Sequence, residues 1–271
     1  MPYPNSKYPI PNSLINYTLH LADNALILAQ QNSAWCAHGP ILEQDIAITN
    51  ISLDLIGQAR NFYQYAAELI NQSTSKPINL STYQPVTEDT LAYLRDNREF
   101  KNCLLVEQTN GDWGKTILRQ FLFSNYQYLL FEKLQHSKDE QLAAISEKAL
   151  KEVIYHLKWS SEWVIRLGDG TEESHLRMLN AVDELWQYAD ELFIAADYEN
   201  QLKENNISVD VTSLKNKWLQ KTEEIFSEAT LTIRKNEFAQ TGGHQGIHTE
   251  HLGYILAEMQ FLQRAYPNSV W

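Results

Sequence analysis

Residues 41–70 read ILEQDIAITNISLDLIGQARNFYQYAAELI, and their periodicity decides the fold class. Mostly apolar residues recur here at steps of three and four, which is the spacing of one buried helix face. This line consists of Ile48, Ile51, Leu55, Gln58, Phe62, Ala66 and Leu69. A second line is polar and consists of Glu43, Asn50, Asp54, Asn61 and Glu68. The stretch is therefore predicted to be one long helix that carries a glutamine on its core face.

The same spacing predicts three other long helices, one from Ser13 to about Asn32, one over about Trp113–Gln135 and one over about Lys138–Leu167. Shorter helices are expected at Glu88–Asp96, Glu99–Glu107, Glu172–Ala195, Thr212–Glu228 and Thr249–Ala265. Strand signals are confined to the short patches Ile207–Val211 and Leu231–Ile233. Four long helices with a long connection between the second and third predict an all-α, ferritin-like four-helix bundle with additional C-terminal helices.

The composition bounds the domain count and the class of partner. No linker divides the 271 residues, so we expect one domain over 1–271, with residues 1–12 as an extended N-terminal segment and Asn71–Thr82 as a surface loop. The net charge of −12 argues against nucleic-acid binding and against a basic membrane-surface protein. Two cysteines, a start without a signal peptide and the lack of a membrane-spanning apolar run predict a cytoplasmic protein.

A bundle of this kind raises the question of a di-iron site, which needs Glu-x-x-His pairs on two of its helices. The one such pair, Glu172–His175, falls in the first turn of a later helix, where Thr171 is a natural N-cap. Glu152 and His156 stand at i and i+4, the spacing of an ordinary charge pair on a helix. His156 also lies on the apolar line of its helix, which is more typical of a hydrogen-bonded core histidine than of a metal ligand.

A histidine-rich stretch lies close to the C-terminus. His244, His248, Glu250 and His251 fall within eight residues and could hold a metal ion. However, Thr249 is a good N-cap, which would leave His248 outside the following helix and separate it from His251. The alternative is a glycine-rich loop that leads into a capped helix, with His248, Glu250 and His251 contacting neighbours or a partner. The sequence leaves both interpretations open.

Four long blocks carry a resemblance to a known family. They are Glu43–Phe62, Leu105–Gly111, Lys151–Leu157 and Gly246–Arg264. Together they resemble the C-subunit (PaaC) family of the bacterial phenylacetyl-CoA epoxidase, an O2-dependent ring 1,2-oxygenase of phenylacetate breakdown. The resemblance covers nearly all of the chain after about Leu14.

The resemblance implies a non-catalytic, structural subunit with no cofactor of its own. It implies that the related A-subunit holds the di-iron centre and is the catalytic one, and that a reductase with FAD and a [2Fe-2S] cluster supplies electrons from NADPH. The positions of the metal ligands in the catalytic relative match Asn24, Leu55, Gln58, Ser124, Val153 and His156 in this chain. Asp23 lies beside the first of these positions. We expect Gln58 and His156 to lie close together inside the bundle, and to pair with each other, with Asp54, with Arg60 or with water.

Three functions therefore remain from the sequence. The first is a scaffold in a heteromer, which binds the catalytic A-subunit and the other epoxidase components. The second is an active di-iron oxygenase or oxidase in its own right, and the third is a helical binding module unrelated to oxygen chemistry. Candidate contact residues for a partner are Trp35, Trp113, Trp159, Trp271, His248, Glu250 and His251, although each tryptophan could equally be part of the core.

Overall fold

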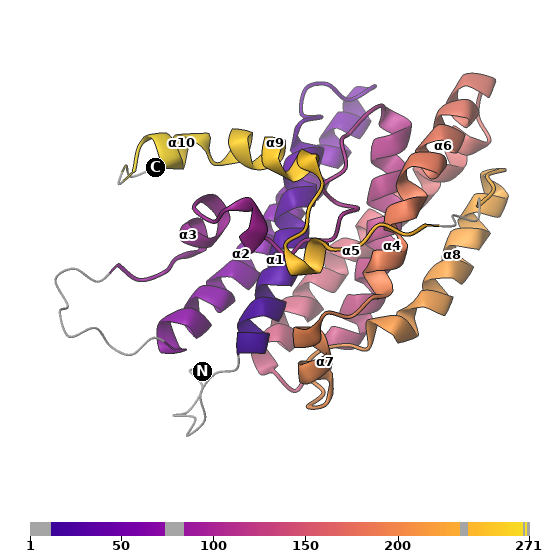
Figure 1. Ribbon diagram of the computed structural model, residues 1–271. Coiled ribbons are helices and arrows are strands. Elements are labelled where there is room, and N and C mark those ends of the chain that lie inside the picture. Colours follow the sequence, from indigo (N-terminus) through magenta and orange to yellow (C-terminus); the bar gives the residue numbers. More distant parts are fainter. Residues whose placement is uncertain (1–11, 74–83, 234–237, 268, 270–271) are drawn as a thin grey trace.

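The fold is built around two pairs of long helices. The computed structural model describes residues 12–73, 84–233, 238–267 and 269. The long helices are α1 (Asn12–Ser33), α2 (Leu42–Ser73), α4 (Trp113–Leu134) and α5 (Glu140–Gly168). Helix α1 packs along α2 and α4 packs along α5, and the two pairs lie side by side (Figure 1). The predicted four-helix core is confirmed, and every residue on the Ile48-to-Leu69 line of α2 is buried.

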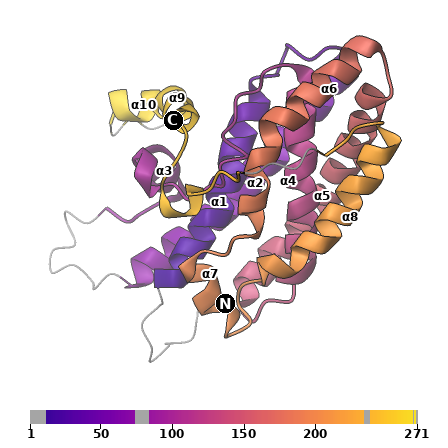
Figure 2. The ribbon, with the colours of Figure 1, turned by 45° about the vertical axis from the view of Figure 1, so that its right-hand side comes forward.

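Smaller elements surround the four long helices. Helices α6 (Glu172–Leu185) and α8 (Lys215–Glu228) pack against α4 and α5, as the view turned by 45° shows (Figure 2). Helix α7 (Asp197–Lys203) packs on α1, and α3 (Glu88–Tyr93) packs on α2. None of the residues that the structure describes lies in a strand. The all-α, ferritin-like class is thereby confirmed, and the two short β-branched patches are not strands.

The C-terminal helices form an arm that projects from the bundle. Helix α9 (Glu250–Met259) begins directly after Thr249 and packs on α1 and on the 3₁₀ turn η1 (Asn97–Glu99). Gln260 separates α9 from α10 (Phe261–Ala265), because its side chain donates to the carbonyl oxygens of Ala92 and Arg95 instead of facing solvent. The single helix expected over Thr249–Ala265 is therefore divided in two.

Two further predicted helices differ from the structure. The helix expected over Glu172–Ala195 ends at Leu185 and continues as the 3₁₀ turns η2 (Trp186–Tyr188) and η3 (Asp190–Phe193). The helix expected over Glu99–Glu107 is wrong, because residues 100–103 are irregular and 104–107 form a turn. The contacts that hold this segment out of a helix are described below.

Some expectations fall on residues that lie outside the described part of the chain. Residues 1–11 and Trp271 lie there, as does most of the expected loop Asn71–Thr82, of which residues 71–73 belong to α2. Within the described ranges, no helix combines the length and the apolar character needed to cross a bilayer.

Candidate functional site

The six positions that match metal ligands all lie inside the bundle. They come from all four long helices, and each residue is at most 4 % exposed: Asn24, Leu55, Gln58, Ser124, Val153 and His156. Their convergence on one core follows from the apolar lines on which they stand. The structure thus buries all six side chains that the sequence grouped.

The polar members from α2 and α5 are joined by two crosswise contacts. His156 Nε2 lies 3.0 Å from a carboxylate oxygen of Asp54, and Gln58 Nε2 donates to a carboxylate oxygen of Glu152 at 2.9 Å. Asp54 and Gln58 stand one helical turn apart on α2, and Glu152 and His156 stand one turn apart on α5. The two contacts therefore lie next to each other and link α2 to α5. The expected partnership of His156 with Asp54 is confirmed. Arg60, one of the alternative partners, takes no part in these two contacts, and its Nε lies 3.5 Å from a carboxylate oxygen of Glu88.

The remaining positions offer little to a metal ion. Leu55 and Val153 have no donor atom, and both are fully buried. Ser124 Oγ accepts a hydrogen bond from Gln120 at 2.8 Å, and Asn24 Oδ1 accepts one from the backbone N–H of Cys103 at 2.8 Å. A di-iron centre needs about six protein ligands, most of them carboxylates. These residues do not fit such a centre.

The other ring nitrogen of His156 does not change this assessment. His156 Nδ1 is buried and has no hydrogen-bond partner. It is a single nitrogen donor, and the positions that would supply carboxylates beside it are Leu55 and Val153. The carboxylate of Asp54 contacts the other ring nitrogen, Nε2, so Nδ1 is one donor with no carboxylate at these two positions, which does not make a di-iron site.

Asp23, next to the first position, is committed to other groups. Its carboxylate forms an ion pair with Arg95 and accepts hydrogen bonds from the hydroxyl of Tyr63 and from the backbone N–H of Lys101, the last at 2.8 Å. Burial raises the pKa of the Tyr63 hydroxyl well above its usual value, and the neighbouring charge of Asp23 raises it further. Asp23 therefore acts as the buried counter-charge of Arg95.

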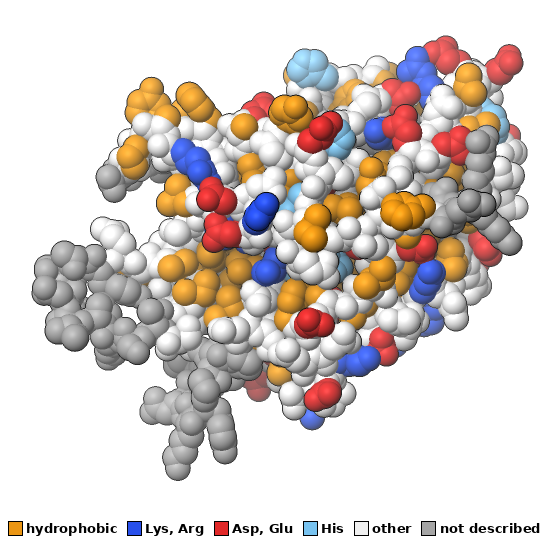
Figure 3. All heavy atoms as spheres, viewed as in Figure 1, with side chains coloured by type: hydrophobic (Ala, Val, Ile, Leu, Met, Phe, Trp, Pro, Cys, Tyr) orange, Lys and Arg blue, Asp and Glu red, His pale blue; other side chains and the backbone are white. Residues whose placement is uncertain are grey.

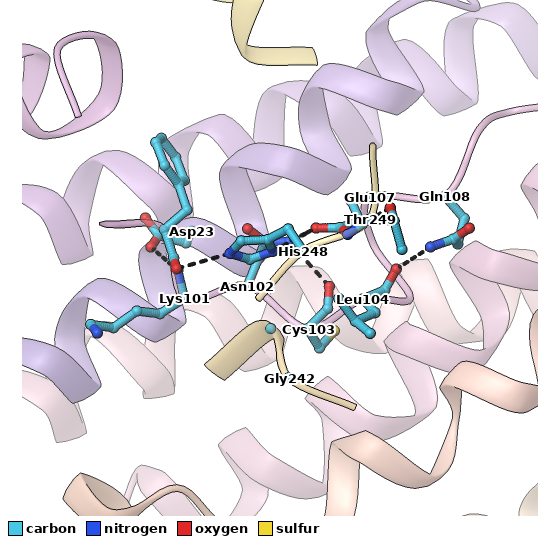
Figure 4. A network of polar contacts seen from close by, with 12 residues as sticks. Asp23, Lys101, Asn102, Cys103, Leu104, Glu107, Gln108, Gly242, His248 and Thr249 are labelled. Atoms are coloured by element: carbon cyan, nitrogen blue, oxygen red, sulfur yellow. Dashed lines mark hydrogen bonds and ion pairs between the residues drawn. The ribbon is translucent and has the colours of Figure 1, made fainter. Parts of the chain in front are cut away.

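The segment from Phe100 to Gln108 crosses the bundle and is held by side chains from other elements (Figure 4). Asp23 accepts from the N–H of Lys101, Asn24 from that of Cys103, and Glu191 of η3 from that of Leu104, at 2.8, 2.8 and 2.6 Å. These acceptors replace the carbonyl oxygens that a helix would supply. For this reason the apolar run Leu104–Val106 lies in a turn and not in the predicted helix.

Glu107 joins this crossing segment to the C-terminal arm. Its side chain is fully buried, and its two oxygens accept four hydrogen bonds. His248 Nδ1 and Asn102 Nδ2 bind one oxygen, both at 2.8 Å, and the backbone N–H and hydroxyl of Thr249 bind the other at 2.7 and 2.8 Å. Burial lowers the pKa of His248, but its hydrogen bond to Glu107 and the charge of Glu107 outweigh this and raise it overall. We call this group the Glu107 clasp.

A second buried carboxylate holds the residues that precede the arm. One oxygen of Glu191 accepts from the backbone N–H groups of Gly242 and Gly243, both at 2.8 Å. Burial raises the pKa of Glu191, and the hydrogen bonds from the backbone oppose this shift. A Cβ atom at Gly243 would lie 2.2 Å from the carbonyl oxygen of Asn102, which explains why glycine occupies this position.

The structure corrects some of the candidate partner contacts. Trp113 is only 9 % exposed and packs edge-to-face against Trp35 and Trp159, with ring centroids 5.0 and 6.2 Å apart. Trp159 is buried as well, so both belong to the core of this chain. The side chain of His248 is fully enclosed by the Glu107 clasp and offers no surface to a partner. Trp35 and His251 are partly exposed and Glu250 is exposed, so these three stay candidates.

The arm itself carries an unusual number of exposed apolar side chains. Tyr254, Phe261, Leu262 and Tyr266 are 48–72 % exposed. Apolar side chains gather on the arm in the surface view (Figure 3). A hollow of about 500 Å³ lies between the arm and the η1 turn, lined by Asn97 and Phe261 among others. Large apolar patches of this kind mark contact surfaces more often than they mark solvent-facing ones.

Fold and core thus define an all-helical bundle protein in whose core Leu55 and Val153 offer no ligand to a metal ion. The chain belongs to the family described as "Phenylacetic acid catabolic protein", whose sequence profile matches residues 6–271. It is also similar to the C-subunit of the 1,2-phenylacetyl-CoA epoxidase of Escherichia coli (strain K12). The two are 46 % identical over 260 residues, which cover 96 % of this chain and 100 % of that relative.

Sequence reasoning grouped the six core positions but missed the Glu107 clasp and the Asp23–Arg95 pair. Glu107 follows directly on the apolar run Leu104–Val106, and a carboxylate at such a place signals a buried acceptor. Two of the blocks that carry the family resemblance, Leu105–Gly111 and Gly246–Arg264, meet at this clasp. Their meeting in space was not evident from their separation in sequence.

Proposed function

We propose that this chain is a non-catalytic, structural subunit of a 1,2-phenylacetyl-CoA epoxidase, and that it binds and supports the di-iron catalytic subunit. The relative that is 46 % identical bears the name of the C-subunit of this epoxidase, and the identity extends over almost the whole chain. The oxygen chemistry would take place in the catalytic subunit, with electrons from a reductase that carries FAD and a [2Fe-2S] cluster.

The observation that carries the proposal is the donor set inside the bundle. Leu55 and Val153 place apolar side chains at two of the six core positions, and the side-chain NH2 group of Gln58 donates a hydrogen bond to Glu152. The two hydrogen-bonded pairs give Gln58 Nε2 and His156 Nε2 partners inside the chain, so neither atom needs a metal ion to avoid being buried unpaired. This donor set supports a core that folds without a metal ion.

The surface offers places where a partner could bind. The arm presents its exposed apolar side chains together with Glu250 and His251, while Trp35 is accessible at the opposite end of α1 from Asn12. We propose these residues as contacts to the other epoxidase subunits. Two free cysteines, Cys36 and Cys103, are compatible with a reducing compartment, and a cytoplasmic location is part of the same proposal.

Iron content tests the non-catalytic role. The isolated chain, expressed aerobically with added iron, is analysed for metal beside the catalytic subunit prepared in the same way. We expect well below one iron atom per chain here and about two in the catalytic subunit. About two iron atoms in this chain, with a di-iron absorption band, would instead establish the alternative of an active di-iron oxygenase. A chain without iron that fails to bind the catalytic subunit would indicate a binding module unrelated to oxygen chemistry.

A further inference from the structure

Helix α2 carries a stripe of apolar side chains that no part of the described fold covers. Leu42, Ile46, Leu53 and Ile56 are 44–72 % exposed, and Thr49 stands between them. These five residues follow one another at steps of four, three, four and three, which is a heptad spacing. We call them the α2 seam.

The seam is distinct from the face with which α2 joins its own bundle. The buried face of α2 contains Ile48, Ile51 and Leu55, all fully buried against the neighbouring helices. Single exposed leucines are common on protein surfaces and need no explanation. Four large apolar residues in a heptad line on one helix form a continuous stripe, which is the pattern that packs along another helix at a shallow crossing angle.

Gly57 gives a second, independent indication. It lies inside α2 beside Ile56, and a Cβ atom at this position would meet nothing within 4 Å. A glycine inside a helix is destabilising relative to alanine, and no contact within the described part of this chain requires it. The lack of a side chain here leaves room for another backbone to approach α2 closely.

The charges beside the seam indicate what kind of helix fits it. Within residues 42–56, the span of the seam, α2 carries three acidic residues, Glu43, Asp45 and Asp54, and no basic one. Asp54 faces His156 of α5, so Glu43 and Asp45 supply the free negative charge along the seam. Arg60 and Glu68 lie beyond Ile56. The whole chain carries a net charge of −12. Two copies joined through this face would bring like charges together, which disfavours association. A partner helix with lysine or arginine beside its own apolar line would be complementary.

From these observations we propose that the α2 seam docks a helix of a different protein chain, one with apolar residues at heptad spacing and basic residues beside them. In the complex proposed above, the partner that supplies this helix is the catalytic subunit, so the assignment of the partner rests on the proposed function. The seam is about 20 Å long, and it would form the centre of an interface that other surfaces complete.

Substitutions on the exposed seam test the proposal without disturbing the core. Leu53→Glu places a charge on the seam, and Gly57→Leu fills the open space beside it. Leu176→Glu on α6 and Ser227→Leu on α8 are matched controls, because both residues are exposed and lie on other helices. All four variants should fold, which thermal unfolding of each isolated chain checks. Affinity for the purified catalytic subunit is measured by isothermal titration calorimetry with the full-length chains.

We expect each seam variant to bind the catalytic subunit about 30-fold or more weakly than the wild type, and each control to bind within about threefold of it. Wild-type affinity in both seam variants would refute the α2 seam as the docking site while leaving the proposed function intact. A wild-type chain that does not bind the catalytic subunit would refute the proposed function and the assigned partner with it. If sedimentation shows that the chain alone forms a dimer that Leu53→Glu dissociates, the seam belongs to a second copy and the proposal is wrong.

Discussion

Removing the charge of Glu107 should release the C-terminal arm from the bundle. In Glu107→Gln the shape of the side chain is kept, but one of its two oxygens becomes an NH2 group. Because one oxygen accepts from Asn102 and His248 and the other from the N–H and hydroxyl of Thr249, either orientation places the new NH2 group against an obligate donor, Asn102 Nδ2 or the backbone N–H of Thr249. A buried donor without a partner costs about 1–3 kcal/mol, so the free energy of unfolding should fall by about that amount.

Two measurements on the same variant separate this effect from a general loss of stability. Urea unfolding gives the change in free energy, and hydrogen exchange gives the protection of the amides of α9 relative to those of α4. We expect the protection of α9 to fall more than that of α4, because the clasp holds the arm. Glu184→Gln is the control, since Glu184 forms an exposed ion pair with Lys115 that should contribute about 1 kcal/mol or less. A loss below about 1 kcal/mol in Glu107→Gln, or equal loss of protection in both helices, would refute the reasoning.

Three further predictions concern the buried polar groups. The pKa of His248 is raised in the folded chain, so the stability that His248 contributes is complete below about pH 6.5 and is lost as the pH rises through the folded pKa. Urea titrations should therefore show that the difference in unfolding free energy between the wild type and His248→Gln shrinks from about pH 6 to about pH 9. A constant or growing difference would contradict this. Asp23→Asn leaves the guanidinium of Arg95 buried without its counter-charge, so urea unfolding should show that the free energy of unfolding falls by about 3–5 kcal/mol. A fall below about 1 kcal/mol would show that the ion pair does not stabilise the fold. Gln58→Leu frees the partly exposed carboxylate of Glu152 to be hydrated, so we expect the free energy of unfolding to change by no more than about 1.5 kcal/mol. Elemental analysis should show an unchanged iron content, and a rise in bound iron would show that Gln58 blocks a metal site.

The helical bundle could be predicted because its signal is local. The apolar lines of α2 and α5 repeat at three and four residues over many turns, and such a line buries itself whatever its partners are. Thr171 fixes the start of α6 in the same local way, because its side chain accepts from the backbone N–H of Ser174. Thr249 also precedes a helix, α9, but its hydroxyl binds the distant Glu107 and makes no cap hydrogen bond. The burial of Gln58 and His156 followed from their places on these lines.

The crossing segment could not be predicted because its conformation depends on distant acceptors. Leu104–Val106 fits a helical pattern as well as a turn, and the choice is made by carboxylates and amides on α1 and η3. The same applies to Glu107, which is paired with a residue 141 positions away. Gly243 and the position of Glu107 directly after Leu104–Val106 are local hints, but neither reveals which parts of the chain meet.

The central claim is that this chain supports epoxidation without performing it, and reconstitution tests that claim most directly. Phenylacetyl-CoA turnover is measured with the catalytic subunit plus the reductase, with this chain plus the reductase, and with all three together. We predict poor turnover by the catalytic subunit on its own, none by this chain on its own, and restored epoxidation when both are present. Full turnover by the catalytic subunit without this chain would contradict the account, as would epoxidation by this chain with the reductase alone.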